Sequence, residues 1–495
     1  MKKFVTIALA TLLLGGAALP SLQQTKVDAA SEKKTLRIYN WEDYIYEPES
    51  ADEQPSIIDQ FIAFKAEAGV DVTVVYDTFA TNEDMYNIMK LGKSSYDLIA
   101  PSDYMIQKMA FEGMLEKYEY DAATQTYANI PNYNTYASKY LKDIYDEIEV
   151  SEYAVGYMWG TLGIVYNPNL PDGRLDAQMM EDVKSWTVLW DEKYKGKISI
   201  KDSMRDAYVV GLLYVHKETI ETLQATLAAG SITEVAFKER MAELLNDTTP
   251  ETVEKVSQAL KELKKNIYGL EVDSGKNDIV TGKITMNTAW SGDAVYAMDI
   301  AEEEEGVELY YSIPDEGANI WFDGWVMPKG ADKELAADFL NFISNPEIAA
   351  LNMDYIGYTS FIAGQEVLSL IHDWYDAEAG GTMVDLTYFF EGTVDVDPED
   401  PATSMIIYSD LVNRQLTAQY PSEEEILRCV IMEHFDNETN NRIVEMWADF
   451  KATTIAAWMI VLIVLLVLGG GGYLVFEIQR RKKSKRHARK AAKSS

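Results

Sequence analysis

The sequence contains a single cysteine, Cys429, and only four histidines among 495 residues. One thiol cannot form an intrachain disulfide, so we expect none. The histidines are scattered, and no H-E-x-x-H, G-x-S-x-G or P-loop pattern occurs. These absences argue against metalloprotease, serine hydrolase and nucleotide-hydrolysing chemistry. We therefore predict no catalytic residues, no metal and no cofactor.

Basic residues are also scarce. The chain has 44 Lys and Arg against 80 Asp and Glu, which gives a net charge of −36, and nine of the 44 lie in residues 480–495. A surface this acidic repels nucleic acid and anionic lipid and favours cationic partners. The charge alone leaves open whether it serves recognition or solubility.

Two long apolar runs stand at the ends of the chain. Lys2 and Lys3 precede the run 4–20, and Ala29 ends a cleavage-like sequence, so we predict a signal peptide at 1–30, with retention as an uncleaved anchor left open. No cysteine follows this run, which excludes a lipoprotein signal. Residues 455–476 carry no charge and are long enough to form a transmembrane helix. The basic tail 477–495 then lies in the cytoplasm. We expect a single-pass protein of the cell membrane whose binding body is extracellular or periplasmic.

Between these runs, the sequence pattern predicts alternating strands and helices. Strands are expected at 35–41, 70–76 and 96–100, with helices between them. This βαβαβ order predicts a mainly parallel sheet, whose ligands bind beyond the carboxyl ends of the strands. Residues 41–44 and 101–105 follow two of these strands and should open onto one crevice. A second series is expected to begin at 153–168, with helices over about 205–265.

Aromatic and acidic residues gather at four strand ends. The clusters are "NWEDYI", "PSDYM", "AWSGDAVY" and "IWFDGW". Each alone is also compatible with core packing beside a turn. Together they suit an amine ligand, because indole and phenol faces attract ammonium groups by about 0.5–2 kcal/mol each and carboxylates add charge-assisted hydrogen bonds. The glutamate run 302–305 is instead expected to be a solvated loop or helix end.

Several segments of residues 35–450 resemble those of a known protein family and occur in the same order, apart from a divergent stretch near 215–280. The segments that carry the resemblance are "YNWEDYI", "NEDMYNIMK", "YDLIAPSDYMIQKM", "YMWGTLGIVYN", "SWTVLWDEKYKGKISI", "WVMP" and "IGYTS". The chain resembles the polyamine (spermidine/putrescine) substrate-binding proteins of ABC importers. This implies a two-lobe α/β fold of the periplasmic-binding-protein type (type II) with crossing hinge strands. Lobe 1 would comprise 35–153 and 318–362, and lobe 2 would comprise 154–317 and 363–450. The implied partners are a polyamine, a permease and its ATPase, and we expect a monomer.

The resemblance also implies a ligand site, residue by residue. The family's aromatic box corresponds to Trp41, Tyr44, Tyr104, Trp290, Trp321 and Tyr358. Its polar and acidic contacts correspond to Glu42, Asp43, Ser102, Asp206, Asp293 and Asp323. Two positions depart from the family: Ser203 stands where many spermidine binders have an aspartate, and Glu433 stands where a glutamine is common. These departures leave open the preference between putrescine and spermidine. For Glu42, Asp43, Ser203 and Glu433, a solvated rim position is an equal alternative.

Other functions are compatible with parts of this pattern. A ferric-iron-binding relative on the same fold would need a pair of tyrosine ligands, and the tryptophans argue against it. A membrane-anchored sensor or adhesin would bind an amine or cation without transport, but the 19-residue tail has no room for a signalling domain. An enzyme acting on amines lacks a recognisable nucleophile. A permease gene beside this one would favour transport.

Overall fold

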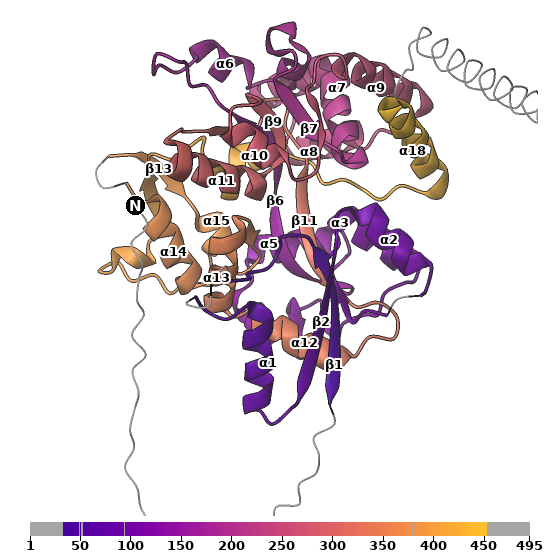
Figure 1. The fold of residues 1–495 in the computed structure, drawn as a ribbon, viewed down its shortest axis with the longest axis vertical. Helices are drawn as coiled ribbons and strands as arrows, with labels where there is room; N and C mark the ends of the chain where they lie inside the picture. The colour runs from indigo at the N-terminus through magenta and orange to yellow at the C-terminus, as the bar shows by residue number, and fades with distance from the viewer. Residues whose placement is uncertain (1–32, 49, 51–52, 94, 378–379, 453–495) are drawn as a thin grey trace, which may run out of the picture.

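The computed structural model describes residues 33–48, 50, 53–93, 95–377 and 380–452. Its main feature is a ten-stranded mixed sheet that passes through an upper and a lower half of the molecule (Figure 1). The expected signal peptide and the expected membrane helix 455–476 lie outside the described residues. Of the helices within them, none combines the length and apolar character needed to span a bilayer.

The N-terminal part folds as the predicted alternation of strands and helices. Its elements are β1 (Lys34–Trp41), α1 (Ile57–Glu67), β2 (Val72–Phe79), α2 (Asn82–Lys90), β3 (Leu98–Ile99), α3 (Asp103–Phe111), β4 (Tyr120–Asp121), β5 (Thr126–Tyr127), α4 (Pro131–Tyr136) and α5 (Lys139–Glu147). β1 pairs in parallel with β2 on one side and with β3 on the other. The carboxyl ends of β1 and β3 therefore meet at one edge of the sheet, which confirms the predicted βαβαβ arrangement.

Side-chain caps fix where helices begin in this part. Ser56 accepts a hydrogen bond from the backbone N–H of Asp59 at the start of α1 (3.0 Å). Thr81 does the same for Asp84 at the start of α2 (3.2 Å). Each cap satisfies a backbone donor that the helix leaves free, a contribution of about 1 kcal/mol. The α2 cap matters for the site because it holds the segment beside Ser102.

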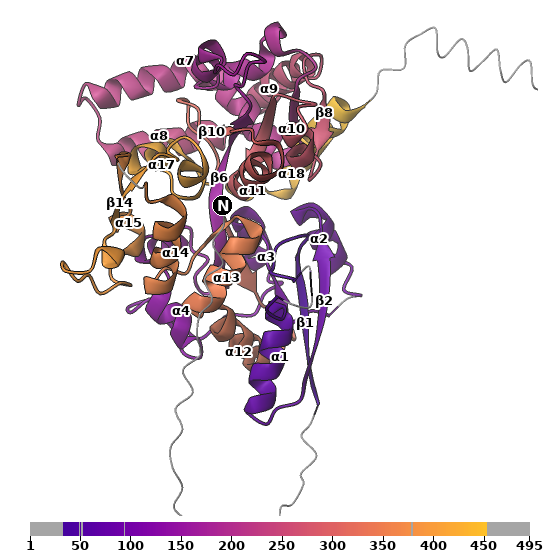
Figure 2. The same ribbon diagram turned by 60° about the vertical axis from the view of Figure 1, so that its left-hand side comes forward.

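The longest strand, β6 (Ala154–Tyr166), connects the two halves of the molecule. It pairs antiparallel with β11 from Ala154 to Thr161, and then with β9 from Leu162 to Tyr166. All 13 of its residues are buried, which is why its sequence is almost entirely apolar, with Thr161 as the exception, instead of alternating. Figures 1 and 2 show β6 running vertically from the lower half into the upper half. A second series of strands and helices was predicted to begin at 153–168, and the structure has at this place one strand that belongs to both halves.

The middle of the chain forms the upper half. Its elements are α6 (Ala177–Asp182), β7 (Ile198–Lys201), α7 (Met204–Ala228), α8 (Glu234–Leu245), α9 (Pro250–Leu263), β8 (Gly269–Glu271), α10 (Gly275–Val280), β9 (Met286–Trp290), α11 (Ser291–Ile300) and β10 (Tyr310–Ser312). The helices expected over 205–265 are α7, α8 and α9. The glutamates 302–305 extend α11 by a π-helical turn and are exposed, as expected for a solvated helix end.

The remaining chain returns through both halves. Its elements are β11 (Ile320–Val326), α12 (Lys333–Ile343), α13 (Pro346–Ile356), β12 (Thr359–Ser360), α14 (Gln365–Tyr375), β13 (Thr382–Asp385), α15 (Thr387–Phe390), β14 (Ile406–Ser409), α16 (Gln415–Gln419), α17 (Glu423–Arg428) and α18 (Asn437–Lys451). β13 and β14 form a separate two-stranded sheet, whereas β11 lies between β3 and β6 in the main sheet. In this part of the chain, α12 lies in the lower half of the molecule and α18 lies in the upper half (Figure 1).

Two apolar cores correspond to the two halves. One contains buried residues from Leu36 to Trp159 and again from Ile320 onward, and the other contains residues from Leu162 to Ala318 together with α18. This arrangement confirms the predicted two-lobe α/β fold. Residues 367–407 pack in the first core, whereas the predicted boundaries placed 363–450 in lobe 2. The exact boundaries stay a prediction, and the packing argues for assigning 367–407 to lobe 1.

Candidate ligand-binding cleft

A cleft of about 1090 Å³ opens between the two halves. Its walls include the segments that follow β1, β3, β7 and β9, together with part of β11. Thirteen of the fourteen predicted site residues line it: Trp41, Glu42, Asp43, Tyr44, Ser102, Tyr104, Ser203, Asp206, Trp290, Asp293, Trp321, Asp323 and Tyr358. The predicted crevice at the strand ends is therefore present, and ligand contact by these residues stays a prediction.

Trp41 closes the gap between the ends of β1 and β3. Its indole Nε1 donates a hydrogen bond to the carbonyl oxygen of Ala100 (2.8 Å). Its ring packs against Phe79 at 4.7 Å and faces Trp290 of the other half at 6.5 Å. The chain then turns at Asp43, whose φ of 50° is in the left-handed region, where a short polar side chain is tolerated. This turn places the exposed side chains of Glu42 and Asp43 at the rim.

Asp323 is a buried carboxylate in the wall of the cleft. The hydroxyl of Tyr44 donates to its Oδ2 (2.8 Å), while its Oδ1 has no hydrogen-bond partner among the described residues. Burial raises the pKa of Asp323 to about 7, although the hydroxyls of Ser102 and Tyr44 oppose this shift. A buried oxygen without a partner is costly. A ligand ammonium at Oδ1 would remove that cost.

Asp103, which the sequence analysis did not single out, lies just beside this position. Its Oδ2 accepts the backbone N–H of Phe322 (2.9 Å) and its Oδ1 accepts the N–H of Tyr104 (2.5 Å). These bonds hold the start of α3 against β11. Burial raises the pKa of Asp103 to about 8, and the nearby Asp323 adds to the shift. Two acids with raised pKa values therefore share one corner of the cleft.

Ser102 and Tyr104 belong to a polar network at the start of α3. The Nδ2 of Asn82 donates to the Ser102 hydroxyl (3.0 Å) and to the Tyr104 hydroxyl (3.1 Å). Tyr104 in turn donates to Oε1 of Glu83 (3.1 Å). The pKa of Glu83 is raised by burial. Both predicted residues thus line the cleft with hydroxyls that already have protein partners.

The ring of Tyr104 is covered by the guanidinium of Arg205, which lies 4.4 Å from the ring centroid. Arg205 also stacks on Phe435 at 3.6 Å and donates to the backbone carbonyl oxygen of Glu433 (2.5 Å). The side chain of Glu433 is exposed and does not line the cleft. The prediction that Glu433 faces the ligand is therefore at odds with this geometry: its contact is made through the backbone.

Ser203 and Asp206 begin α7 at the opposite wall. The Ser203 hydroxyl caps the helix by accepting the backbone N–H of Asp206 (3.4 Å). The indole Nε1 of Trp290 donates to Oδ2 of Asp206 (3.2 Å). Burial raises the pKa of Asp206, against the lowering effect of Ser203 and Trp290. Asp206 is thus a buried carboxylate on the opposite wall of the cleft from Asp323 and Asp103.

Asp293 differs from the other acids because the protein itself neutralises it. Its Oδ2 lies 2.7 Å from Nζ of Lys201, and its Oδ1 accepts the hydroxyl of Tyr358 (2.8 Å) and lies 3.7 Å from Nζ of Lys276. Burial would raise the pKa of Asp293, but the two ammonium groups outweigh it and lower the pKa. The sequence analysis missed Lys201. The available signal was a lysine that ends the apolar strand "ISIK" at the sheet edge where the cleft lies.

Two α/β halves joined by shared strands, with an aromatic and acidic cleft between them, define a solute-binding protein. The chain belongs to the family of bacterial extracellular solute-binding proteins, whose sequence profile matches residues 60–377. It is 27% identical over 343 residues to the spermidine/putrescine-binding periplasmic protein of Escherichia coli K12, covering 69% of this chain and 81% of the relative. It is 28% identical over 340 residues to the putrescine-binding periplasmic protein PotF of the same organism, covering 67% and 79%.

Solved structures show the same fold. The spermidine/putrescine ABC transporter substrate-binding protein PotD from Streptococcus pneumoniae superposes with a TM-score of 0.53 at 25% identity, covering 84% of this chain and 98% of that one. Within the described part of this chain, no group of three or more His, Cys, Asp and Glu side chains is placed to hold a metal ion.

Proposed function

We propose that the chain is an extracellular or periplasmic receptor that binds a polyamine of the putrescine and spermidine class. The observation that carries the proposal is the buried Oδ1 of Asp323, which has no partner in the described protein and lies in a cleft lined by aromatic rings. An alkyl ammonium satisfies that oxygen by a charge-assisted hydrogen bond, and the rings attract the ammonium and pack on the methylenes. The names of the relatives support this ligand class.

We further propose that the receptor delivers its ligand to an ABC permease driven by a separate ATPase. The ligand would enter between the two halves, and bending of β6 and β11 would bring the halves together around it. Because contacts on both walls form only in the closed state, the ligand favours closure. A permease would then recognise the closed form.

The location of the receptor is also part of the proposal. A signal peptide at 1–30 would export the chain, and a helix at 455–476 would hold it at the membrane with the tail 477–495 in the cytoplasm. The basis is the sequence: an uncharged run long enough for a bilayer, followed by nine basic residues. Tethering keeps the receptor near its permease and raises the local concentration.

The test is calorimetric titration of the full-length chain, purified in mild detergent, with putrescine, spermidine and spermine. We expect one-to-one binding of at least one of them. Asp323→Asn should weaken that binding at least about 30-fold, because truncating one partner of a buried charge pair costs about 2 kcal/mol or more. Asp71→Asn is the matched control, since Asp71 is exposed at the opposite end of β2 from the cleft.

The outcomes separate the parts of the proposal. Binding that survives Asp323→Asn would show that the amine position lies elsewhere in the cleft. Absence of binding for all three polyamines would overturn the ligand class, and the transport role would fall with it.

A further inference from the structure

The ammonium group of Lys201 is almost completely buried and lies directly behind the cleft wall, in contact with residues that line the cleft. Its Nζ lies 2.7 Å from Oδ2 of Asp293, 2.8 Å from the carbonyl oxygen of Val272 and 3.2 Å from Oε1 of Glu271. It also lies over the indole ring of Trp290, 4.4 Å from the centroid. The three N–H bonds of the ammonium group thus have three oxygen neighbours.

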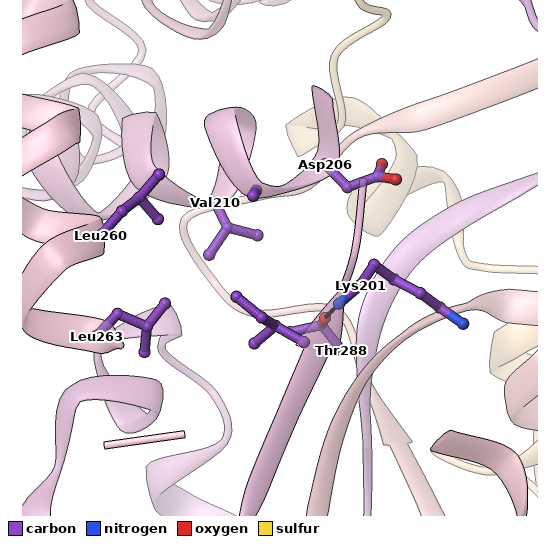
Figure 3. Close-up of a pocket in the computed structure, with 8 residues that line it drawn as sticks. Lys201, Asp206, Val210, Leu260, Leu263 and Thr288 are labelled. Atoms are coloured by element: carbon purple, nitrogen blue, oxygen red, sulfur yellow. Dashed lines mark hydrogen bonds between the residues drawn. The ribbon is translucent and has the colours of Figure 1, made fainter. Parts of the chain in front are cut away.

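The backbone fixes Lys201 in this orientation. Its N–H donates to the Thr288 hydroxyl (3.0 Å), where β7 runs beside β9. Figure 3 shows the side chains of Lys201 and Asp206 extending in the same direction, away from Leu260 and Leu263. The cavity lined by these apolar and polar groups measures only about 10 Å³, which is at most the space of one water molecule.

An indole face and a carboxylate around one ammonium are the arrangement that an amine ligand requires. Here the protein supplies that ammonium from its own chain. Both carboxylate oxygens of Asp293 have protein partners, because Lys201 pairs with Oδ2 and both Tyr358 and Lys276 approach Oδ1. A ligand amine at this position would have to displace Lys201 and would meet a like charge.

The remaining buried acids of the described cleft fall into two groups. Asp103 and Glu271 are committed to protein partners: Asp103 to the N–H groups of Tyr104 and Phe322, and Glu271 to the N–H of Gly275 and the ammonium group of Lys201. The half-buried Glu83 accepts the Tyr104 hydroxyl. Asp323 retains an oxygen without a partner, and the hydrogen-bond donor to the Asp206 carboxylate is a neutral indole N–H, although the charges of Lys201 and Arg205 also act on it. Two buried carboxylates therefore remain for a ligand.

We propose that Lys201 determines specificity by occupying the amine position formed by Trp290 and Asp293, which limits the ligand to two buried ammonium contacts, at Asp323 and Asp206. The ligand is then a linear aliphatic diamine in preference to a triamine or tetraamine, whose additional ammonium would face the positive charge of Lys201. This inference rests on the proposed function and deepens it, because it assigns the chain-length preference.

The first test compares 1,4-diaminobutane with spermidine by calorimetric titration of the unmodified full-length chain. We expect the diamine to bind at least about 10-fold more tightly. Equal or tighter binding of spermidine would overturn the inference while leaving the proposed function intact. Absence of binding for both amines would instead be the failure of the proposed function.

The second test removes the built-in ammonium. Lys201→Met alone would remove the ammonium group beside Oδ2 of Asp293 and beside Glu271 and would leave Lys276 as the cation near Asp293. We therefore combine it with Glu271→Gln, which keeps the net charge and preserves an acceptor for the Gly275 N–H. This double variant frees Oδ2 of Asp293 and one face of Trp290, and its affinity for spermidine relative to the diamine should rise at least about 10-fold. Lys201→Arg, which retains the positive charge, should keep the diamine preference.

Circular dichroism and the melting temperature establish that each variant is folded. A folded double variant whose ratio of diamine to spermidine affinity equals that of the unmodified chain would overturn the role of Lys201. The role of Lys201 is supported if the ratio of diamine to spermidine affinity shifts toward spermidine in the double variant and is unchanged in Lys201→Arg.

Discussion

The hydroxyl of Tyr44 lies 2.8 Å from Oδ2 of Asp323, although 279 residues separate the two in sequence. Tyr44 follows β1 and Asp323 belongs to β11, so the bond joins the two strands that flank β3 in the sheet. The Tyr44 ring also meets Tyr157 and Tyr358 edge to face, at 5.3 and 5.0 Å. One side chain thus orients the carboxylate and forms part of the aromatic wall.

Tyr44→Phe should therefore weaken polyamine binding at least about 10-fold, since a hydrogen bond to a charged group contributes about 1.5–3 kcal/mol. The ring remains, so the aromatic wall persists while the carboxylate loses its donor. Calorimetric titration measures the effect. Tyr96→Phe is the control, because Tyr96 also donates to an aspartate, Asp77 (3.0 Å), but at an exposed site. Equal affinities for Tyr44→Phe and the unmodified chain would contradict the role of this bond.

Ligand affinity should depend on pH through Asp323. Burial raises the pKa of this carboxyl to about 7, so it holds its proton in the free protein below that pH. An ammonium ligand binds the ionised form, and the polyamine itself stays protonated. Affinity should fall about tenfold for each pH unit below about 7 and level off above it.

Titrations from pH 5 to pH 8.5, in buffers of different ionisation enthalpy, measure the affinity and the protons released. Asp103→Asn should retain this dependence, since Asp103 bonds backbone N–H groups and not the ligand. A flat profile in the unmodified chain would show that Asp323 is not the titrating group.

The same raised pKa predicts how stability changes with pH in the ligand-free protein. Between about pH 4 and pH 7 the folded carboxyl of Asp323 binds a proton that the unfolded chain has released. The contribution of this group to the free energy of unfolding is thus largest below about pH 4 and decreases as the pH rises through about 7. Denaturant unfolding of the unmodified chain and Asp323→Asn across this range isolates the contribution. An identical pH dependence in both would contradict it.

Gly292 lies against Tyr358, and a Cβ at this position would come within 2.1 Å of the tyrosine ring. Gly292→Ala should lower the free energy of unfolding by about 1–3 kcal/mol, as overpacking does, and should weaken binding because Tyr358 would shift away from Asp293. Denaturant titration measures the stability. Gly269→Ala serves as the control, since nothing lies within 4 Å of its Cβ position. A fully stable Gly292→Ala protein would show that Tyr358 moves freely.

Arg205 bridges the two halves by stacking on Tyr104 of one core and Phe435 of the other. Arg205 is part of α7, so its contact with Tyr104 is the one of these two that crosses between the halves. Arg205→Met should favour separation of the halves, because it removes this cation–π contact, which is worth about 0.5–2 kcal/mol. Small-angle scattering of the ligand-free chain should then show a larger radius of gyration. Arg240→Met is the control, as Arg240 is exposed and pairs only locally with Glu243 in the described structure. An unchanged radius in Arg205→Met would contradict the bridging role.

Local sequence patterns predicted most residues that line the cleft. They did not predict contacts that depend on the pairing of strands far apart in the sequence. Trp41 and Trp290 end their strands, and the end of an apolar strand can be read from a few neighbouring residues. The ion pair of Lys201 with Asp293 depends on β7 lying beside β9, which pairs Ile198 with Met286. No local sequence pattern encodes that register, so the sequence alone does not distinguish Lys201 from any other lysine at the end of a strand.

The same distinction explains two further differences. The apolar run 153–168 correctly indicated a strand, but its sequence does not encode that β6 pairs with β11 over one part and β9 over the other. The family resemblance assigns Glu433 to the site, with a solvated rim position as an equal alternative, and this residue lies in a loop, where side-chain direction is not fixed by a strand or helix period. The structure directs its side chain to solvent and its carbonyl to Arg205.

β6 supplies residues 154–159 to one core and 162–166 to the other. Neither half could therefore be expressed alone with a complete core. A polypeptide cut within this strand would give two pieces that each carry an incomplete core and need the other to fold. Split versions of the receptor would therefore work as a complementation pair, in which assembly of the pieces is itself the folding step.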